Sequence, residues 1–419
     1  MNAEQQKVYD DVVQGKSVVV TGAGGVGKSY LIDKIVSWTQ ETNINVGITA
    51  MTGCAAILVR GTTLHSFLGI GLGNKPVADL VRDVSIKRRS VVQRLLSLEL
   101  LVVDEISMLN DSLMDMVSEY LCAIRRNPRP FGGVQFVFSG DLYQIPPISG
   151  KMFFHSKVWN QIKGEVAVYE LKSSQRHKGD EVFHNILAKL RTGVCDENTV
   201  RILTSTQQNT FKPSIKPTIL YTKNVDVDII NNYELEKLVT AGATMNEYHV
   251  KTSNQLAAKS WATSCKVPDS VRLCVGAQVM LTWNIDLERK LVNGSRGVVT
   301  SITPLSVTVE FQNAPTTCIE YTKIEHPDNK DIWIKFMPLR LAYAVTVNKS
   351  QGSTLDAAII DMDIGSSSAE FLYGKFYTAI SRVRDLKSVI VKNVKPSLFV
   401  THPDVPSFYM TAMMDKLTI

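Results

Sequence analysis

The clearest chemistry in this chain lies in the octapeptide GAGGVGKS at residues 22–29, which matches the phosphate-binding pattern G-x-x-x-x-G-K-[ST]. Glycines let the backbone curl until successive N–H groups point at one anion, and the start of the following helix adds partial positive charge. Lys28 has the reach to contact the β- and γ-phosphates of a nucleotide, and the Ser29 hydroxyl is suited to bind Mg²⁺. The residues expected to hold the triphosphate are Gly22, Gly24, Gly25, Val26, Gly27, Lys28 and Ser29.

Two further apolar runs end in polar groups with matching chemistry. Residues 100–103 lead into Asp104, a candidate magnesium ligand, and Glu105, a candidate base that orients and deprotonates the attacking water. Residues 134–139 lead into Asp141 and Gln144, where the Gln144 amide is placed to sense the γ-phosphate. The alternative for this second pair is that both residues only form a turn after the strand.

Two arginines further along the chain, Arg176 and Arg382, have two possible roles. Taken by composition alone, each is a surface ion-pair partner. If their segments face the triphosphate site, an arginine delivered from another domain would stabilise charge in the transition state of phosphoryl transfer.

The elements that must position these groups are strands and helices in alternation. Apolar runs at 18–21, 46–50, 100–103 and 134–139 alternate with helical segments, which predicts a parallel sheet covered by helices on both faces. A second α/β block with runs at 218–222, 343–347, 357–361 and 389–391 begins near residue 169. Short β-rich runs with Gly and Asn between 272 and 336 indicate an all-β insert, and the polar stretch 71–97 indicates a small helical one.

Composition bounds the class of protein. With 419 residues, 44% of them hydrophobic, the chain is long enough for two to four domains. The net charge of +6 permits a nucleic-acid partner without establishing one. The six scattered cysteines include no C-x-x-C pair, which argues against a zinc site or a disulfide framework. No signal-peptide core and no membrane-length apolar run is seen, so we expect a soluble intracellular protein in a compartment the sequence leaves open.

Taken together and in this order, the motifs resemble those of the Pif-one family of DNA helicases, in the 5′-to-3′ branch of superfamily 1. The resemblance extends over about residues 3–393. It rests on NAEQ at 2–5, TAMTGCAA at 49–56, TTLHSF at 62–67, DEISM at 104–108, GDLYQ at 140–144, LVNGSRG at 291–297, NKSQGST at 348–354 and AISR at 379–382.

The resemblance implies two RecA-like domains with ATP between them. The first would comprise residues 1–70 and 98–168 with a small insert at 71–97, and the second residues 169–271 and 337–419 with a small β-barrel insert at 272–336. Gln5 would contact the adenine, Gly352 would belong to the ATP site, and Arg176 and Arg382 would come from the second domain. The implied DNA contacts are Thr52, Thr63, His65, Phe67, Lys349, Gln351 and Thr354. The alternative for His65 and Phe67 is ordinary core packing at the base of a loop.

Two positions depart from the family pattern. Residues 175–177 read Gln-Arg-His where the family has Phe-Arg-Gln, and Asn348 stands where the family has His.

The motifs as a whole predict an ATP- and magnesium-dependent helicase that moves 5′ to 3′ on single-stranded DNA. It would unwind forked or tailed duplexes as a monomer, with no membrane partner. The alternatives are an RNA-directed superfamily 1 helicase and a P-loop ATPase that remodels protein complexes. A nucleic-acid-binding module with a decayed ATP site is disfavoured because all the residues expected to bind and hydrolyse ATP are present. They are Gln5, Lys28, Ser29, Asp104, Glu105, Gln144, Arg176 and Arg382.

Overall fold

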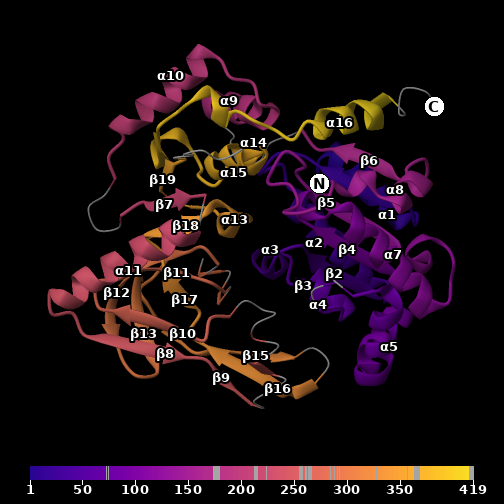
Figure 1. The fold of residues 1–419 in the computed structure, drawn as a ribbon, viewed down its shortest axis with the longest axis horizontal. Helices are drawn as coiled ribbons and strands as arrows, with labels where there is room; N and C mark the ends of the chain where they lie inside the picture. Colours follow the sequence, from indigo (N-terminus) through magenta and orange to yellow (C-terminus); the bar gives the residue numbers. More distant parts are fainter. Residues whose placement is uncertain are drawn as a thin grey trace. The chain divides into compact units, whose positions relative to one another are not determined.

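The chain forms two compact units, which are described separately below (Figure 1). The computed structural model describes residues 1–71, 73, 75–172, 180–211, 216–222, 224–253, 258–259, 262, 267–283, 285–286, 288–289, 291, 293–312, 314–326, 329–355, 357–362 and 369–414. Unit 1 comprises Met1–Val194, Ser368–Tyr377 and Phe399–Ile419, and unit 2 comprises Cys195–Ser367 and Thr378–Leu398.

Unit 1 is built on a six-stranded sheet whose strand order is β3-β2-β4-β5-β1-β6, with every neighbouring pair parallel. Its strands are β1 (Val18–Thr21), β2 (Val46–Ala50), β3 (Thr62–Thr63), β4 (Leu100–Asp104), β5 (Gln135–Gly140) and β6 (Ala167–Glu170). The central strands β1 and β4 are buried along their whole length. This confirms the predicted parallel sheet, because near-continuous apolar strands are stable only when both faces of a sheet are covered.

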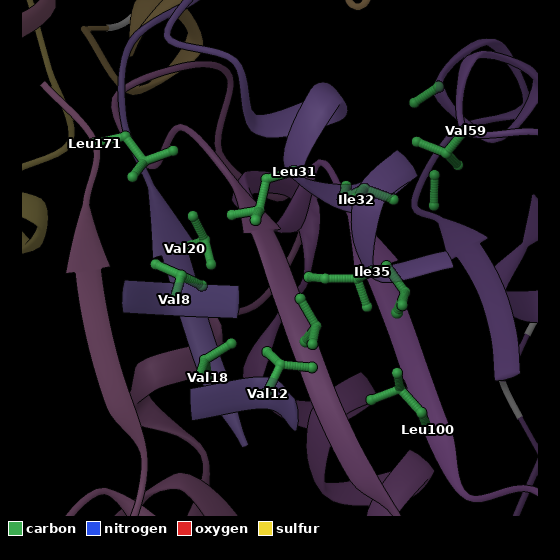
Figure 2. Packing of buried hydrophobic residues seen from close by; sticks show 14 of the residues in the cluster. Val8, Val12, Val18, Val20, Leu31, Ile32, Ile35, Val59, Leu100 and Leu171 are labelled. Carbon is green, nitrogen blue, oxygen red and sulfur yellow. The ribbon is translucent and has the colours of Figure 1, made fainter. Parts of the chain in front are cut away.

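Helices supply that cover. Those of unit 1 are α1 (Ala3–Val13), α2 (Lys28–Glu41), α3 (Gly53–Leu58), α4 (Leu64–Leu68), α5 (Val77–Lys87), α6 (Arg89–Ser97), α7 (Asp111–Arg125), α8 (Lys157–Ile162), α9 (Glu181–Thr192), α14 (Ala369–Leu372) and α16 (Asp404–Met414). The helix α15 (Lys375–Ile380) continues from unit 1 into unit 2 after Tyr377. Figure 2 shows Val8 and Val12 of α1 and Ile35 of α2 in one apolar cluster with Val18 and Val20 of β1 and Leu100 of β4.

Unit 2 contains a smaller parallel sheet of order β18-β7-β19-β20. Its strands are β7 (Thr218–Tyr221), β18 (Ala344–Thr346), β19 (Ala358–Asp361) and β20 (Val389–Lys392), and its helices include α10 (Glu197–Ser205), α11 (Asn224–Thr240) and α13 (Val347–Ser350). The short 3₁₀ turns of the two units are η1 (Ile106–Met108), η2 (Pro130–Gly133), η3 (Phe153–His155), η4 (Thr206–Gln208), η5 (Leu386–Ser388) and η6 (Pro396–Leu398).

A β-rich part of unit 2 includes the segment 272–336, where short β-runs were expected, and extends beyond it to strands at residues 245–252 and 339–341. An antiparallel five-stranded sheet has the order β14-β13-β12-β11-β17, and two smaller sheets pair β10 with β8 and β15-β16-β9. These strands are β8 (Met245–His249), β9 (Lys251–Thr252), β10 (Ser270–Cys274), β11 (Gln278–Leu281), β12 (Arg296–Ile302), β13 (Ser306–Phe311), β14 (Thr317–Glu320), β15 (Thr322–His326), β16 (Asn329–Phe336) and β17 (Leu339–Leu341). They enclose a core of their own, which includes Leu273, Val279, Val307 and Leu339.

The units differ from the domains expected from the sequence in three whole helices. The sequence predicted α9, α14 and α16 in the second domain, whereas all three belong to unit 1. The reason is packing: Phe408 of α16 stacks on Phe154 with ring centroids 4.6 Å apart, and Asp404 of the same helix pairs with His155 at 2.8 Å. Among the helices that the structure describes, none has the length and apolarity to cross a lipid bilayer.

Candidate active site

The glycine-rich loop joins β1 to α2 in the predicted strand–loop–helix arrangement. Gly22 and Gly27 have φ angles of 145° and 89°, in the region that favours glycine. A Cβ at Gly27 would lie 2.5 Å from Gln5 Nε2, and one at Gly22 would lie 2.5 Å from the Leu171 carbonyl oxygen. Gly22 therefore requires glycine for space as well as for conformation, and Gly27 requires it for conformation.

The other members of the loop divide into backbone and side-chain roles. Val26 is 2% exposed and belongs to the core beneath the loop, so only its backbone is available to a phosphate. Gly25 has a φ of 88°, which helps to turn the chain, and Gly24 is half-buried. Ser29 is the second residue of α2 and is exposed, so its hydroxyl is available to a ligand at the helix N-terminus.

Lys28, the first residue of α2, folds back over this loop. Its Nζ donates hydrogen bonds to the carbonyl oxygens of Gly22 at 2.6 Å and Ala23 at 3.0 Å. Burial lowers the pKa of the Lys28 ammonium. Three carboxylates oppose this shift, in the order Asp141, Glu105 and Asp104. The ammonium is therefore held at the loop by acceptors that a phosphate group would replace.

Gln5, predicted to read the adenine, contacts the same loop. Its Oε1 accepts from the Asn2 backbone N–H at 3.0 Å, in a capping box that starts α1. Its Nε2 donates to the carbonyl oxygens of Val26 and Gly27, each at 3.4 Å. In the structure Gln5 supports the loop, and its contact with a base stays a prediction.

Asp104 and Glu105 stand where β4 ends, beside the end of β5. Asp104 is 9% exposed, and burial raises the pKa of its carboxyl while Lys28 acts in the opposite direction. Glu105 has φ 58° and ψ 44°, a left-handed conformation that costs a non-glycine residue about 1–3 kcal/mol. A Cβ at Gly140 would lie 2.8 Å from the Ile106 nitrogen, so glycine is what lets β5 end so close to the Glu105 turn.

The turn after β5 carries Asp141 and Gln144. Asp141 is fully buried, and it accepts hydrogen bonds from the Tyr143 backbone N–H, the Arg191 guanidinium and the Tyr377 hydroxyl. Gln144 is 4% exposed, and its Oε1 has no hydrogen-bond partner among the described residues. A buried polar atom without a partner is rare, and it is satisfied when a water or a ligand group binds there.

The donor set at this edge of the sheet suits a magnesium nucleotide. Mg²⁺ prefers oxygen ligands, often one or two protein oxygens together with phosphate oxygens. The Ser29 hydroxyl and the Asp104 carboxylate are such groups, and the loop N–H groups and Lys28 supply the positive charge that phosphates require.

Neither predicted arginine is among the described residues of unit 1, in which this site is built, and their role stays a prediction. Arg176 lies outside the part of the chain that the structure describes. Arg382 belongs to unit 2 and is 4% exposed. Its contacts include hydrogen bonds to Thr378 O at 3.0 Å and Ser381 Oγ at 2.9 Å. Gly352 follows α13 in unit 2 with a φ of 79°.

The DNA-contact candidates of unit 1 follow β2 and β3. Thr52 Oγ1 accepts from the Ala55 N–H at 3.2 Å, and Thr63 caps α4 by accepting from the Ser66 N–H at 3.3 Å. Both threonines are half-buried, as is His65. Their hydroxyls therefore lie at helix starts that follow parallel strands of the sheet.

Phe67 is a packing residue in this structure. It is 9% exposed, and a Cβ added at Gly47 would lie 2.5 Å from its Cζ, which shows how closely the ring approaches β2. The Arg94 guanidinium covers the ring at 4.7 Å from its centroid. The Phe67 ring therefore packs closely in unit 1, and its contact with DNA stays a prediction.

The candidates in unit 2 surround the short helix α13. Thr346 caps the helix by accepting from the Lys349 N–H at 3.3 Å, and it leaves the Lys349 side chain exposed. Gln351 is 1% exposed, and Thr354 is half-buried. Lys349 is thus the most accessible of the three to a polyanion.

Sequence reasoning missed the residues that hold Asp141. No motif assigned that role to Arg191, Tyr377 or Tyr409. Arg191 and Tyr377 lie 50 and 236 residues from Asp141, and Tyr409 lies 218 residues from Arg191, its partner in the network. The signal that points to them is the buried Asp141 itself, because a buried carboxylate requires donors.

Comparison with known proteins identifies the chain's family. The model of the PIF1-like helicase family matches residues 1–201, and that of the DNA helicase Pif1 2B domain matches residues 258–302. The chain belongs to the PIF1-like helicase family. The predicted family, the predicted fold class and the assignment to the helicase enzymes are therefore confirmed.

Relatives and solved structures agree with this membership. The chain is 33% identical to the ATP-dependent DNA helicase PIF1 of Danio rerio, over 100% of this chain and 65% of that protein. It is 29% identical to the uncharacterized protein 030L of Invertebrate iridescent virus 6, over 100% of this chain and 96% of that protein. The crystal structure of Pif1 helicase from Candida albicans matches with a TM-score of 0.82 at 29% identity, over 98% of this chain and 99% of that one. The chain thus spans just under two thirds of the fish helicase.

Proposed function

We propose that this chain is an ATP-dependent DNA helicase that moves 5′ to 3′ along single-stranded DNA and unwinds duplexes. The observation that carries the proposal is the convergence of three parallel strand ends in unit 1. The turns after β1, β4 and β5 place Lys28, the pair Asp104 and Glu105, and Gln144 at one edge of the sheet. Ligands of open α/β sheets bind at this carboxyl edge.

Each of these groups has a task in phosphoryl transfer. Loop N–H groups and Lys28 would bind the β- and γ-phosphates, and Lys28 would exchange its two carbonyl acceptors for phosphate oxygens. Glu105 would orient the attacking water and accept its proton. Gln144 would donate a hydrogen bond from Nε2 to a γ-phosphate oxygen, and its Oε1, which is buried without a partner among the described residues, would accept one from a water. Ser29 and Asp104 would hold Mg²⁺, which neutralises phosphate charge when bound.

Arg176 and Arg382 are proposed to complete the site when ATP draws the two RecA-like domains together. An arginine that arrives in the closed state stabilises the charge of the transition state, and its departure after hydrolysis would release the domains. The support for this step is family membership. A solved Bacteroides Pif1, 26% identical to this chain, is described as a complex with ADP-AlF4.

Single-stranded DNA is the proposed track. Sequence-tolerant binding requires cations, hydroxyls and amides along the phosphate backbone. Thr52, Thr63 and His65 in unit 1 and Lys349, Gln351 and Thr354 in unit 2 are the proposed contacts. Support comes from solved Bacteroides Pif1 structures described as bound to single-stranded DNA and from one described as two coordinating Pif1 helicases at forked DNA. We propose that one copy suffices for translocation.

The deciding experiment measures ATP-dependent unwinding of four matched substrates. They are DNA duplexes with a 5′ or a 3′ single-stranded tail, and RNA duplexes with the same two tails. We expect unwinding of the 5′-tailed DNA only, at a rate per enzyme that does not change with enzyme concentration. Unwinding of the RNA set instead would establish the RNA-directed alternative. ATP hydrolysis that no single strand stimulates would favour a protein-remodelling ATPase.

A further inference from the structure

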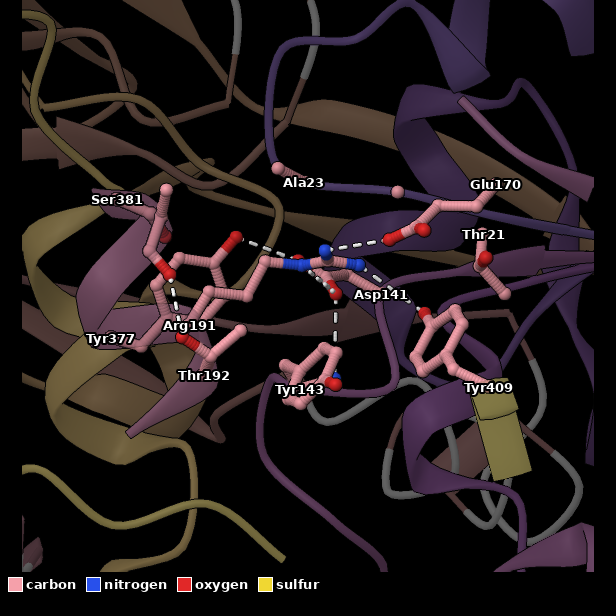
Figure 3. A network of polar contacts seen from close by, with 12 residues as sticks. Thr21, Ala23, Asp141, Tyr143, Glu170, Arg191, Thr192, Tyr377, Ser381 and Tyr409 are labelled. Atoms are coloured by element: carbon pink, nitrogen blue, oxygen red, sulfur yellow. Dashed lines mark hydrogen bonds and ion pairs between the residues drawn. The ribbon is translucent and has the colours of Figure 1, made fainter. Parts of the chain in front are cut away.

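Arg191 of α9 is the centre of a buried polar network within unit 1 (Figure 3). Its Nε donates to Asp141 Oδ1 at 3.0 Å and its Nη1 to Glu170 Oε1 at 2.7 Å. Its Nη2 donates to the Tyr409 hydroxyl at 3.2 Å. One guanidinium thus joins α9 to the turn after β5, the end of β6 and α16.

The same guanidinium also holds the turn through an aromatic ring. It lies 4.6 Å from the ring centroid of Tyr143 and 5.6 Å from that of Tyr409. The two rings stack on each other, with centroids 5.2 Å apart and an interplanar angle of 3°. Arg191 therefore contacts two residues of the turn, Asp141 and Tyr143, and the second of them immediately precedes Gln144.

Tyr377 of α15 holds the other oxygen of Asp141. Its hydroxyl donates to Asp141 Oδ2 at 2.7 Å. Burial raises the pKa of the Tyr377 phenol, and Asp141 raises it further, so the group stays a donor. Close by on the chain, a Cβ at Gly374 would lie 2.3 Å from the Gln144 carbonyl oxygen. The start of α15 is thus packed directly against the Gln144 backbone.

A buried carboxylate explains why these contacts determine geometry. Asp141 is fully buried, and the side chains of Arg191 and Glu170 are only 13% and 14% exposed. Removing one partner of such a pair leaves an uncompensated charge away from water, so the turn would move to recover a donor. A displacement of about 1 Å at a catalytic group is enough to cost roughly a hundredfold in rate.

We propose that Arg191 and Tyr377 are positioning residues for ATP hydrolysis, which act through Asp141 to hold the turn that carries Gln144. The inference rests on the proposed function, since it assigns Gln144 to the γ-phosphate. Neither residue touches the nucleotide in this proposal. Their shared task is to fix a carboxylate from two directions, one from α9 and one from α15.

The test compares steady-state ATP hydrolysis of Arg191→Lys and Tyr377→Phe with that of the unaltered chain, at saturating single-stranded DNA. We expect kcat to fall roughly tenfold or more for Arg191→Lys, because one compact ammonium cannot reach three acceptors that are spread around a planar guanidinium, and by about threefold to tenfold for Tyr377→Phe. KM for ATP should change by less than about threefold. Because both residues act on one carboxylate, the double variant should lose less than the product of the two single losses.

Arg125→Met is the matched control. Arg125 is also a half-buried helix arginine of unit 1, but its guanidinium donates to the backbone carbonyls of Leu95, Leu98 and Gly132. We expect it to lower the thermal midpoint without lowering kcat when each variant is assayed at an equal margin below its own midpoint. This separates positioning from a general loss of stability.

Defined results overturn the proposal. Wild-type kcat in both Arg191→Lys and Tyr377→Phe would do so, as would a kcat loss in Arg125→Met equal to theirs. Losses of the two variants that multiply in the double variant would show independent roles and would also overturn it. Should Arg191→Lys fail to fold, the isosteric Tyr377→Phe decides alone. If the unaltered chain does not hydrolyse ATP, the proposed function fails, an outcome distinct from the failure of this inference.

Discussion

The turns after β1 in unit 1 and after β18 in unit 2 each place a lysine in a helix that follows a parallel strand. In unit 1, Lys28 is half-buried, donates to two loop carbonyls and has three carboxylates in its electrostatic surroundings. In unit 2, Lys349 is exposed, one turn into a helix that Thr346 caps. The same side chain is thus embedded among charges in one unit and open to water in the other.

This difference separates two kinds of anion binding. Charges in a partly buried site interact strongly and over short distances, so they suit chemistry on one small, highly charged ligand. An exposed lysine gains little from any single contact, but it contributes through counterion release when a polyanion binds. We therefore expect variants in unit 1 to change hydrolysis and variants near α13 to change DNA affinity.

The largest expected effect is that of Lys28→Ala. DNA-stimulated ATP hydrolysis should fall roughly a thousandfold, since both phosphate binding and stabilisation of the transition state are lost. Affinity for an oligo-dT strand without nucleotide should stay within about twofold. The matched control is Lys34→Ala, on the exposed side of the same helix, which should retain wild-type turnover. Undiminished ATP hydrolysis in Lys28→Ala would contradict the proposal that Lys28 binds the phosphates of ATP.

Glu105→Gln should have the next largest effect, because it removes a general base and keeps the shape of the side chain. Turnover should fall about a hundredfold while ATP affinity, measured with a fluorescent analogue, stays within about threefold. Glu119→Gln on the exposed face of α7 is the control. Equal losses of turnover and affinity would mean that Glu105 acts in binding and not in proton transfer.

Lys375 allows the effect of burial on a lysine to be measured separately from the binding of an anion. Its side chain is 7% exposed, its ammonium lies 3.1 Å from the Phe371 ring centroid, and burial lowers its pKa to about 8. Because the unfolded chain binds a proton here up to a pKa near 10.4, the free energy of unfolding should rise as pH increases from about 8 to 10. The expected contribution is about 1–3 kcal/mol, and it is lost on acidification below that window.

Urea unfolding of the unaltered chain and of Lys375→Met at pH 7.5 and pH 10 checks this prediction. The variant should be more stable than the unaltered chain at pH 7.5, and the difference should shrink at pH 10. An equal difference between the two proteins at both pH values would contradict it.

The smallest effect belongs to Lys349→Ala. Affinity for oligo-dT should fall about threefold to tenfold, and the slope of log affinity against log salt should decrease by about 0.7, as expected for one phosphate contact on a single strand. Hydrolysis of ATP without DNA should not change. A salt slope equal to that of the unaltered chain would place Lys349 away from the track.

The chemistry of unit 1 was predictable from the sequence because it depends on contiguous residues. The loop at 22–29, Asp104 with Glu105, and Gln144 each follow a strand directly, so a local pattern suffices to place them at the carboxyl edge of a parallel sheet. The alternation of apolar and helical runs was enough to predict that sheet.

Other features depend on packing between distant segments. The close packing of the Phe67 ring against β2 could not be predicted from the sequence, because it depends on the room that Gly47 leaves for the ring. The membership of α9, α14 and α16 in unit 1 was missed because all three follow residues expected to start the second domain.

The partners of Asp141 show most clearly which contacts could not be predicted from the sequence. Its contacts with Arg191 and Tyr377 span 50 and 236 residues of sequence. Sequence alone determined that an aspartate follows the apolar run 134–139, and it predicted an ATP site beside that aspartate. Only the tertiary structure decided which side chains hold that aspartate, because a buried carboxylate takes its donors from whichever segments the fold packs against it.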